Sequence, residues 1–134
     1  VVSLQSNSGY AGGYNEGLKH IEADVYVLLN SDVEVSPNWL DEPACRFSEN
    51  EKLGALQPTI RAWKDKHSFE YAGAAGGYID SMGYPFCAGR LFEQVDMDSG
   101  QYAYHKAIFW ASGACMFVRA KAYWQAGGLD ARYF

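Results

Sequence analysis

The sequence predicts an α/β fold with a mostly parallel central sheet. The first observation is an uninterrupted apolar run, Val25-Tyr26-Val27-Leu28-Leu29, because such runs are typical of strands covered on both faces. The second is the order of the segments before it: residues 1–4 are predicted to form a short strand and residues 13–22 a helix. Strand, helix and strand in succession form the βαβ unit of parallel sheets.

The rest of the chain continues this alternation. Ser36-Pro37 is typical of a helix start, with serine as the N-cap and proline at the first helical position. Gly127-Gly128 is typical of a helix end. Between residues 61 and 106 the pattern weakens, as it does in functional or mobile segments. The further predicted elements are a helix at residues 36–50, strands at 54–60 and 114–118, and a helix at 120–126.

Composition limits the class of protein. With 49% hydrophobic residues, the chain of 134 residues can bury one core. Both ends lack a closing element, so we expect residues 1–134 to form a single partial domain, incomplete at both ends. The net charge of −5 argues against a nucleic-acid partner, although it allows a nucleotide whose phosphates are held by a cation.

Neither a membrane span nor a disulfide framework is expected in this chain. No segment approaches the roughly 20 apolar residues of a transmembrane helix. Cys45, Cys87 and Cys115 are odd in number, far apart and without the short spacing of a zinc site. We therefore interpret them as buried, reduced thiols of a cytoplasmic protein.

The sharpest chemical signal is Asp32-Val33-Glu34, which follows the apolar run. The carboxyl ends of strands are where open α/β sheets bind ligands. If the backbone stays extended, Asp32 and Glu34 point the same way, and two converging carboxylates suit Mg²⁺ or Mn²⁺. Such a cation would neutralise a diphosphate leaving group. Taken alone, the pair is better explained as a turn residue and a solvated charge.

A second signal is the glycine- and asparagine-rich stretch from Asn7 to Asn15. Its glycines would let backbone N–H groups approach a ligand, and the N-terminus of a following helix favours anionic groups. The stretch lacks the Gly-Lys-Ser/Thr ending of a Walker loop and the G-x-G-x-x-G fingerprint. A tight turn before a helix is the alternative.

These two signals occur in the same order as in a known family. Together with Phe109-Trp110-Ala111-Ser112-Gly113-Ala114-Cys115-Met116 and Gly127-Gly128-Leu129-Asp130, they resemble the family 2 glycosyltransferases over nearly the whole chain. The resemblance implies inverting enzymes with the GT-A (Rossmann-like) fold, a three-layer α/β/α arrangement. It also implies a nucleotide-sugar and metal-binding half at residues 1–60 and an acceptor-side half at residues 61–134.

The resemblance also implies roles for single residues. Asp32 and Glu34 match the D-x-D position, with Asp32 near the donor ribose and the cation, and Glu34 as the more direct metal ligand. The glutamate is longer than the usual aspartate by one methylene, which leaves the preferred metal open. The other implied donor contacts are Asn7, Gly9 and Asn15 beside the nucleotide, and Ser112 and Gly113 beside the donor sugar.

The general base is expected outside the chain. The resemblance places it shortly after Phe134, so we expect no turnover from residues 1–134 alone. Asp130 is the nearest candidate for the base, and a turn residue is its alternative. Separately, the guanidinium fork of Arg90 suits a diphosphate or acceptor contact, with a surface or ion-paired arginine as the alternative.

The leading hypothesis is therefore glycosyl transfer, of a hexose or deoxyhexose, in polysaccharide biosynthesis. The partners would be a nucleotide-diphospho-sugar and a hydroxyl of a glycan or lipid-linked acceptor. A sugar nucleotidyltransferase ranks lower, because the glycine-rich stretch has no basic residue before Lys19. A non-catalytic nucleotide- or carbohydrate-binding domain stays open. We expect a cytoplasmic location and allow for peripheral association of the full protein with the inner face of the membrane.

Overall fold

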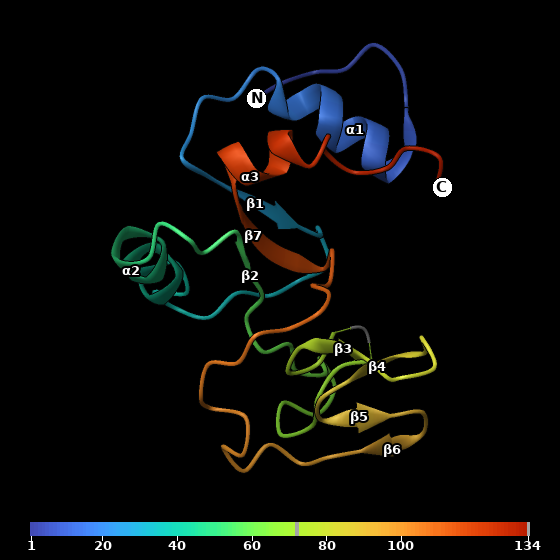
Figure 1. Ribbon diagram of the computed structural model, residues 1–134. Coiled ribbons are helices and arrows are strands. Elements are labelled where there is room, and N and C mark those ends of the chain that lie inside the picture. The colour runs from blue at the N-terminus through green and yellow to red at the C-terminus, as the bar shows by residue number, and fades with distance from the viewer. Residues whose placement is uncertain (72, 134) are drawn as a thin grey trace. The chain divides into compact units, whose positions relative to one another are not determined.

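The computed structural model describes residues 1–71 and 73–133, which divide into two compact units (Figure 1). Unit one consists of Val1–Leu28, Ser36–Ala55 and the segment from Phe117 onward. Unit two consists of Leu29–Val35 and Leu56–Met116. These units are defined by packing, and the functional halves at residues 1–60 and 61–134 stay a prediction.

Within residues 1–71 and 73–133, two small sheets and three helices make up the regular structure. One sheet has three strands in the order β1-β7-β2, and the other has four strands in the order β3-β4-β5-β6. The helices are α1 (Gly9–Leu18), α2 (Asp41–Glu49) and α3 (Ala120–Gln125). The strands are β1 (Val25–Leu29), β2 (Ala55–Leu56), β3 (Gly77–Ile79), β4 (Pro85–Cys87), β5 (Arg90–Leu91), β6 (Gln94–Val95) and β7 (Cys115–Arg119).

The strand pairings given by hydrogen bonds and register are antiparallel. At one end of β1 and β7, the Asn30 N–H donates to the Ala114 carbonyl (3.0 Å). At the other end, the Ala120 N–H donates to the Asp24 carbonyl (2.9 Å). The β3-β4-β5-β6 sheet is antiparallel throughout. The mostly parallel sheet is thus not confirmed, because an apolar run indicates burial on both faces but not the direction of the neighbouring strand.

The N-terminal segment differs from its prediction. Residues 1–4 form no strand, and α1 begins at Gly9 rather than near Gly13. The helix can begin there because the Asn7 side-chain oxygen accepts the Gly9 N–H (2.9 Å), which satisfies one donor of the first turn. Four of its ten residues are glycine, so packing of the buried Ala11 and Leu18 holds this helix more than intrinsic propensity does.

Helix α2 begins later than Ser36-Pro37 predicts. The Ser36 carbonyl accepts the Trp39 N–H (3.3 Å), which closes a single turn. Asn38 then adopts a left-handed conformation (φ 59°), and this interrupts any helix that starts at Pro37. Helix α2 itself starts at Asp41. The carboxylates of Asp41 and Glu42 lie in its first turn, where they interact favourably with the positive end of the helix dipole.

The weakly patterned segment contains the four-stranded sheet. Its strands are only two or three residues long, too short to show an alternating pattern. Gly89 turns the chain between β4 and β5 with φ 87°, and a side chain there would approach the Phe69 ring to within 2.6 Å. Phe69 is 1% exposed, so glycine is required where the chain crosses this core residue.

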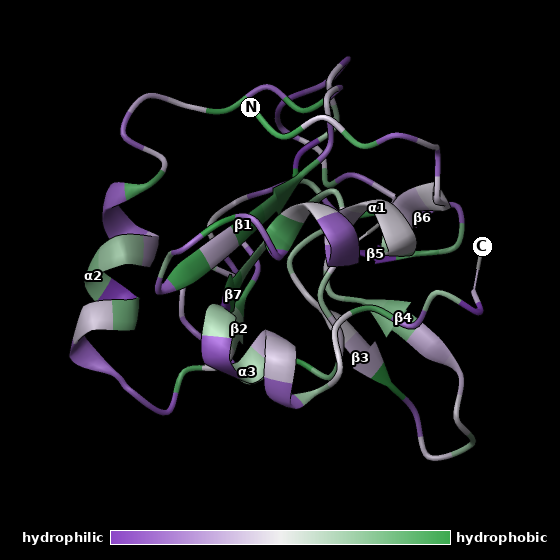
Figure 2. Ribbon diagram, turned by 90° about the horizontal axis from the view of Figure 1, so that it is seen from above, coloured by the Kyte–Doolittle hydropathy of each residue, from purple (hydrophilic) through white to green (hydrophobic). Residues whose placement is uncertain are grey.

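The strands β1 and β7 carry much of the core of unit one. Figure 2 shows both mainly in the green of hydrophobic residues. Leu28 is fully buried, and Phe117 and Val118 are nearly so. As predicted, β1 occupies the apolar run and α3 ends at two glycines with positive φ. Within the described residues, no helix has the length and apolar character needed to cross a membrane.

The cysteines only partly follow their prediction. All three thiols are free. Cys115 lies buried in β7, whereas Cys45 is exposed on α2, where its Sγ lies 3.3 Å from the Glu49 Oε1. A buried position is therefore correct for Cys115 and wrong for Cys45, because Cys45 lies on the solvent side of an amphipathic helix.

Two glycine-to-alanine changes should affect stability in opposite directions. Gly17 has helical φ and open space around its Cα, so Gly17→Ala should raise the free energy of unfolding by about 0.4–1 kcal/mol. Gly128 has φ 77°, and an added Cβ would collide with the Asn15 side-chain oxygen. Gly128→Ala should therefore destabilise. Urea unfolding measures both, and equal effects would contradict this account of the backbone.

Candidate functional site

The first of the two carboxylates after β1, that of Asp32, lies in a turn. The Val33 N–H donates to the Asn30 carbonyl (3.3 Å), so the chain bends immediately after the strand. Asp32 lies within this turn and Glu34 follows it, and both residues are exposed. The extended backbone under which both side chains would point the same way does not occur. Convergence on a cation would therefore depend on side-chain rotamers.

Glu34 forms an ion pair with a lysine of the same chain. The Lys66 Nζ lies 2.8 Å from the Glu34 Oε2, with the two side chains 60% and 51% exposed. The same Nζ lies 5.0 Å from the centroid of the Trp63 ring. Lys66 thus neutralises the carboxylate that is the predicted metal ligand, and a divalent cation would have to displace it.

The carboxylates of this region suit a cation that is also held by ligands from outside the protein. Within residues 1–71 and 73–133, no group of three or more His, Cys, Asp or Glu side chains gathers as a metal site would need. Asp32 and Glu34 can therefore offer two carboxylates at most. Mg²⁺ is usually held in this way, by one or two carboxylates together with substrate phosphates and water. The residues present fit such a cation.

Ser112 is held in place by a side chain that the sequence did not single out. The Ser112 N–H donates to the Gln57 side-chain oxygen (2.6 Å), and the Gln57 amide nitrogen donates to the Gly73 carbonyl (2.8 Å). The Ser112 hydroxyl accepts the Ala114 N–H (3.2 Å). Ser112 is 7% exposed, and Gly113 lies in the turn before β7. A glutamine after a short strand carries no sequence signal that separates this role from a surface position.

The pairing of β1 with β7 brings two of the predicted motifs together within unit two. The hydrogen bond from Asn30 to Ala114 lies two residues before Asp32 and two residues after Ser112. The carboxylate turn and the Ser112-Gly113 segment therefore emerge from neighbouring strands. This neighbourhood is the candidate functional site.

Asn15, the predicted nucleotide contact in unit one, is engaged in three internal hydrogen bonds. Its side-chain oxygen accepts the Leu129 N–H (2.9 Å) and the Tyr123 hydroxyl (2.6 Å). Its amide nitrogen donates to the Leu129 carbonyl (2.7 Å). The amide thus fixes α1 to the segment after α3. Asn7 and Gly9 form the start of α1, and the donor contacts of all three residues stay predictions.

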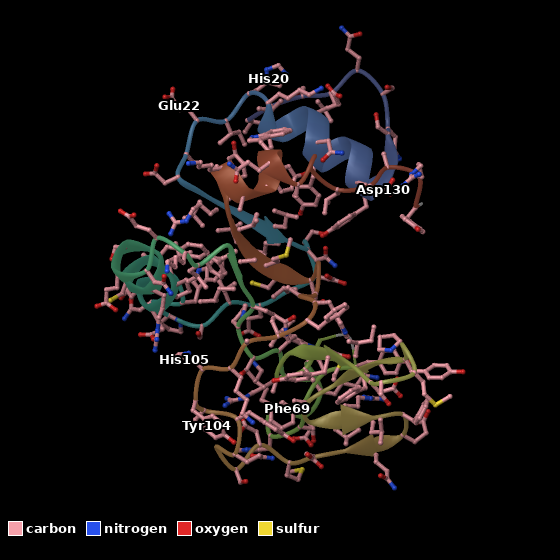
Figure 3. The ribbon with its side chains drawn as sticks, in the orientation of Figure 1. His20, Glu22, Phe69, Tyr104, His105 and Asp130 are labelled. Carbon is pink, nitrogen blue, oxygen red and sulfur yellow. The ribbon has the colours of Figure 1, made fainter. Side chains whose placement is uncertain are left out.

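Arg90 and Asp130 are both engaged locally. The Arg90 guanidinium lies over the Tyr71 ring (4.7 Å), and its Nε donates to the Phe92 carbonyl (3.1 Å). Asp130, labelled in Figure 3, receives hydrogen bonds from the Arg132 guanidinium and backbone, and these lower its pKa. A lowered pKa makes a carboxylate a poorer proton acceptor. Asp130 is accordingly a weak candidate for the base.

Replacement of Asn15 should cost stability whether or not the residue contacts a nucleotide. Asn15→Ala leaves the Leu129 backbone and the Tyr123 hydroxyl without their partner, which should lower the free energy of unfolding by about 1–3 kcal/mol. Asn50→Ala is the matched control, because it removes one exposed side-chain hydrogen bond, from the Lys52 N–H. Urea unfolding that gave equal losses for both variants would contradict the structural role of Asn15.

Comparison with known proteins agrees with this arrangement of motifs. The chain is 30% identical over 118 residues to the N-acetylglucosaminyl-diphospho-decaprenol L-rhamnosyltransferase of two Mycobacterium tuberculosis strains, an alignment of 83% of this chain and 37% of theirs. It is 26% identical over 121 residues to the O-antigen biosynthesis protein RfbC of Myxococcus xanthus, an alignment of 89% of this chain and 9% of that protein.

The chain thus spans little more than a third of the mycobacterial relatives and a small part of the Myxococcus protein. No solved structure matches it. The family model described as "Glycosyl transferase family 2" matches residues 1–126, nearly the whole chain. The predicted resemblance is confirmed, and the chain belongs to glycosyl transferase family 2.

Proposed function

We propose that the protein moves a sugar from a nucleotide-diphospho-sugar to a hydroxyl of a glycan or lipid-linked acceptor, with inversion and with the help of Mg²⁺ or Mn²⁺. The observation that carries the proposal is the pair of exposed carboxylates, Asp32 and Glu34, directly after β1 in a chain matched by the family over residues 1–126. The names of the relatives support hexosyl or deoxyhexosyl transfer in polysaccharide biosynthesis.

Glu34 and Asp32 would hold the cation. When bound, the cation would neutralise the departing diphosphate. Glu34 would exchange its ion pair with Lys66 for the metal, and the released ammonium would remain near the same anionic group. Because both side chains are more than half exposed, this exchange needs only rotamer changes and little desolvation.

The Ser112-Gly113 segment would position the donor sugar. Gln57 ties it to Gly73 through two hydrogen bonds, so its backbone is fixed before any ligand arrives. A fixed segment loses less entropy on binding than a mobile one. We propose Asn7, Gly9 and Asn15 as further donor contacts, and Arg90 as a contact of the donor diphosphate or of the acceptor.

The acceptor hydroxyl must lose its proton as it attacks the donor carbon. A carboxylate whose pKa lies near the working pH would serve best as general base. We propose that this residue follows Phe134, as the family resemblance implies. Asp130, whose pKa is lowered by its hydrogen bonds with Arg132, is a poorer proton acceptor. A cytoplasmic location, with peripheral association of the full protein at the inner face of the membrane, completes the proposal.

Binding of a nucleoside diphosphate should depend on the cation and on Glu34. In calorimetric titrations with UDP and dTDP, Mn²⁺ should strengthen binding, and Glu34→Ala should weaken it about tenfold or more, the size of a lost contact to a charged group. Glu51→Ala is the matched control, because Glu51 is exposed and lies after α2. The cation site would be refuted if each nucleotide bound with the same affinity in EDTA as in Mn²⁺.

Removal of Lys66 should favour the cation. Lys66→Met leaves the Glu34 carboxylate without its internal partner, so Mn²⁺ affinity at low salt should rise, by up to about fivefold for an exposed ion pair. Titration of Mn²⁺ followed by electron paramagnetic resonance measures the change. The control is Lys64→Met, two residues away. The proposed competition between Lys66 and the cation for Glu34 is contradicted if both variants bind Mn²⁺ with the affinity of the unmodified protein.

A further inference from the structure

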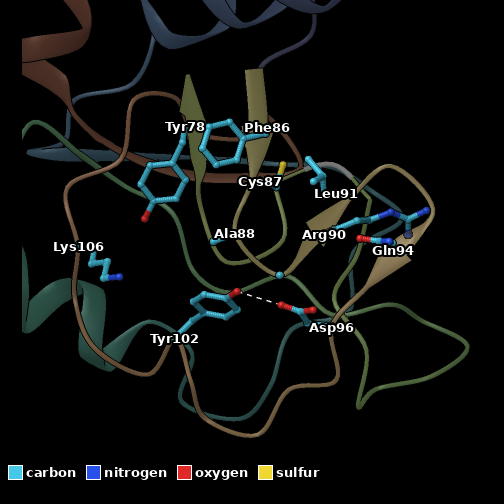
Figure 4. Close-up of a pocket in the computed structure, with 11 residues that line it drawn as sticks. Tyr78, Phe86, Cys87, Ala88, Arg90, Leu91, Gln94, Asp96, Tyr102 and Lys106 are labelled. Carbon is cyan, nitrogen blue, oxygen red and sulfur yellow. Dashed lines mark hydrogen bonds between the residues drawn. The ribbon is translucent and has the colours of Figure 1, made fainter. Parts of the chain in front are cut away.

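Unit two contains a groove of about 420 Å³ on its four-stranded sheet (Figure 4). Of the predicted site residues, only Arg90 lines it. The volume lies within the range of about 300–1,000 Å³ that is common for small-molecule sites. The other lining residues that matter here are Tyr78, Phe86, Gln94, Asp96, Tyr102 and Lys106.

One part of the groove is aromatic. Tyr78 on β3 and Phe86 on β4 face each other in register, with ring centroids 5.7 Å apart and planes 27° from parallel. The Trp110 indole donates to the Tyr78 carbonyl (3.0 Å) and so fixes the backbone of β3. Phe86 remains 39% exposed, and the aromatic surface is open to solvent.

Another part of the groove is polar. The Tyr102 hydroxyl donates to the Asp96 Oδ2 (3.0 Å), as Figure 4 shows. This bond fixes the carboxylate, and the second oxygen, Oδ1, has no hydrogen-bond partner among residues 1–71 and 73–133. Gln94, on β6, contributes an amide that both donates and accepts. Fixed acceptors and amides beside an aromatic surface are suited to hydroxyl groups.

The groove is lined by one negative and two positive side chains. Asp96 is negative and Lys106 is positive, and the Lys106 Nζ lies 4.7 Å from the Tyr104 ring. The third charge, the Arg90 guanidinium, lies over the Tyr71 ring and bonds the Phe92 carbonyl. Both cations lie over aromatic rings, Tyr104 and Tyr71, at the groove, which also offers an apolar face and hydrogen-bonding groups. Such a lining suits a ligand with one apolar face and several hydroxyls.

We infer that this groove binds a saccharide unit of the acceptor. The C–H face of a pyranose ring packs on Tyr78 and Phe86, while its hydroxyls donate to the Asp96 carboxylate and exchange hydrogen bonds with Gln94. The inference rests on the proposed glycosyl transfer and adds to it the surface and the chemical class of the acceptor. It requires neither the cation nor the nucleotide.

Saccharide binding can be measured without turnover. Saturation-transfer difference NMR of the protein with N,N′-diacetylchitobiose and with maltose should give transfer to the ring protons of at least one of them. Phe86→Ala should weaken that binding about threefold to tenfold, the usual effect of losing one aromatic contact. Asp96→Asn keeps the shape of the side chain and should weaken it as well.

The controls separate this site from the surrounding surface. Tyr84→Ala removes an aromatic ring that is 66% exposed on the same hairpin but does not line the groove, and Glu93→Gln removes a carboxylate at the next turn. Both controls should bind the saccharides normally. Equal loss in the controls, absence of binding by both saccharides, or binding of glucose 1-phosphate alone would overturn the inference. None of these outcomes bears on metal-dependent nucleotide binding. The calorimetric titrations measure that binding separately and test the proposed transfer function.

Discussion

The arrangement of the candidate site depends on the antiparallel pairing of β1 with β7. The hydrogen bond between Asn30 and Ala114 joins segments that are far apart in the sequence. It places the carboxylate turn beside the segment that contains Ser112, so that the predicted cation ligands and the predicted sugar contacts share one neighbourhood. Because ladder hydrogen bonds fix register, a slip of one residue would turn the side chains of β7 to the opposite face and separate the two motifs.

Most of the polar residues at this site already have partners within the protein. Lys66 neutralises Glu34, and Gln57 fixes Ser112 through a pair of hydrogen bonds. Their physical roles differ. An exposed ion pair is weak and can be exchanged, whereas buried hydrogen bonds set a rigid backbone. The combination gives a site whose framework is fixed before binding while its charged groups remain free to change partners.

The sequence predicted the residues of this region better than their geometry. The apolar run gave β1 almost to the residue, since burial on both faces leaves a continuous pattern. The start of α2 was placed too early because the left-handed Asn38 interrupts the helix that Ser36-Pro37 suggests. The groove beside Phe86 could not be predicted, because strands of two or three residues carry no period and their pairing is decided by turns.

The sequence by itself determined the family, the order of its motifs and the strand that precedes Asp32. These depend on local composition and spacing, which are visible along one chain. Only the tertiary structure decided that the strands run antiparallel, that Lys66 neutralises Glu34, and that Asn15 holds α1 in place. Those features are contacts between distant residues, and a contact depends on the path of the chain between them. The carboxylate pair was thus predictable from the sequence, whereas the ion pair of Glu34 with Lys66 was not.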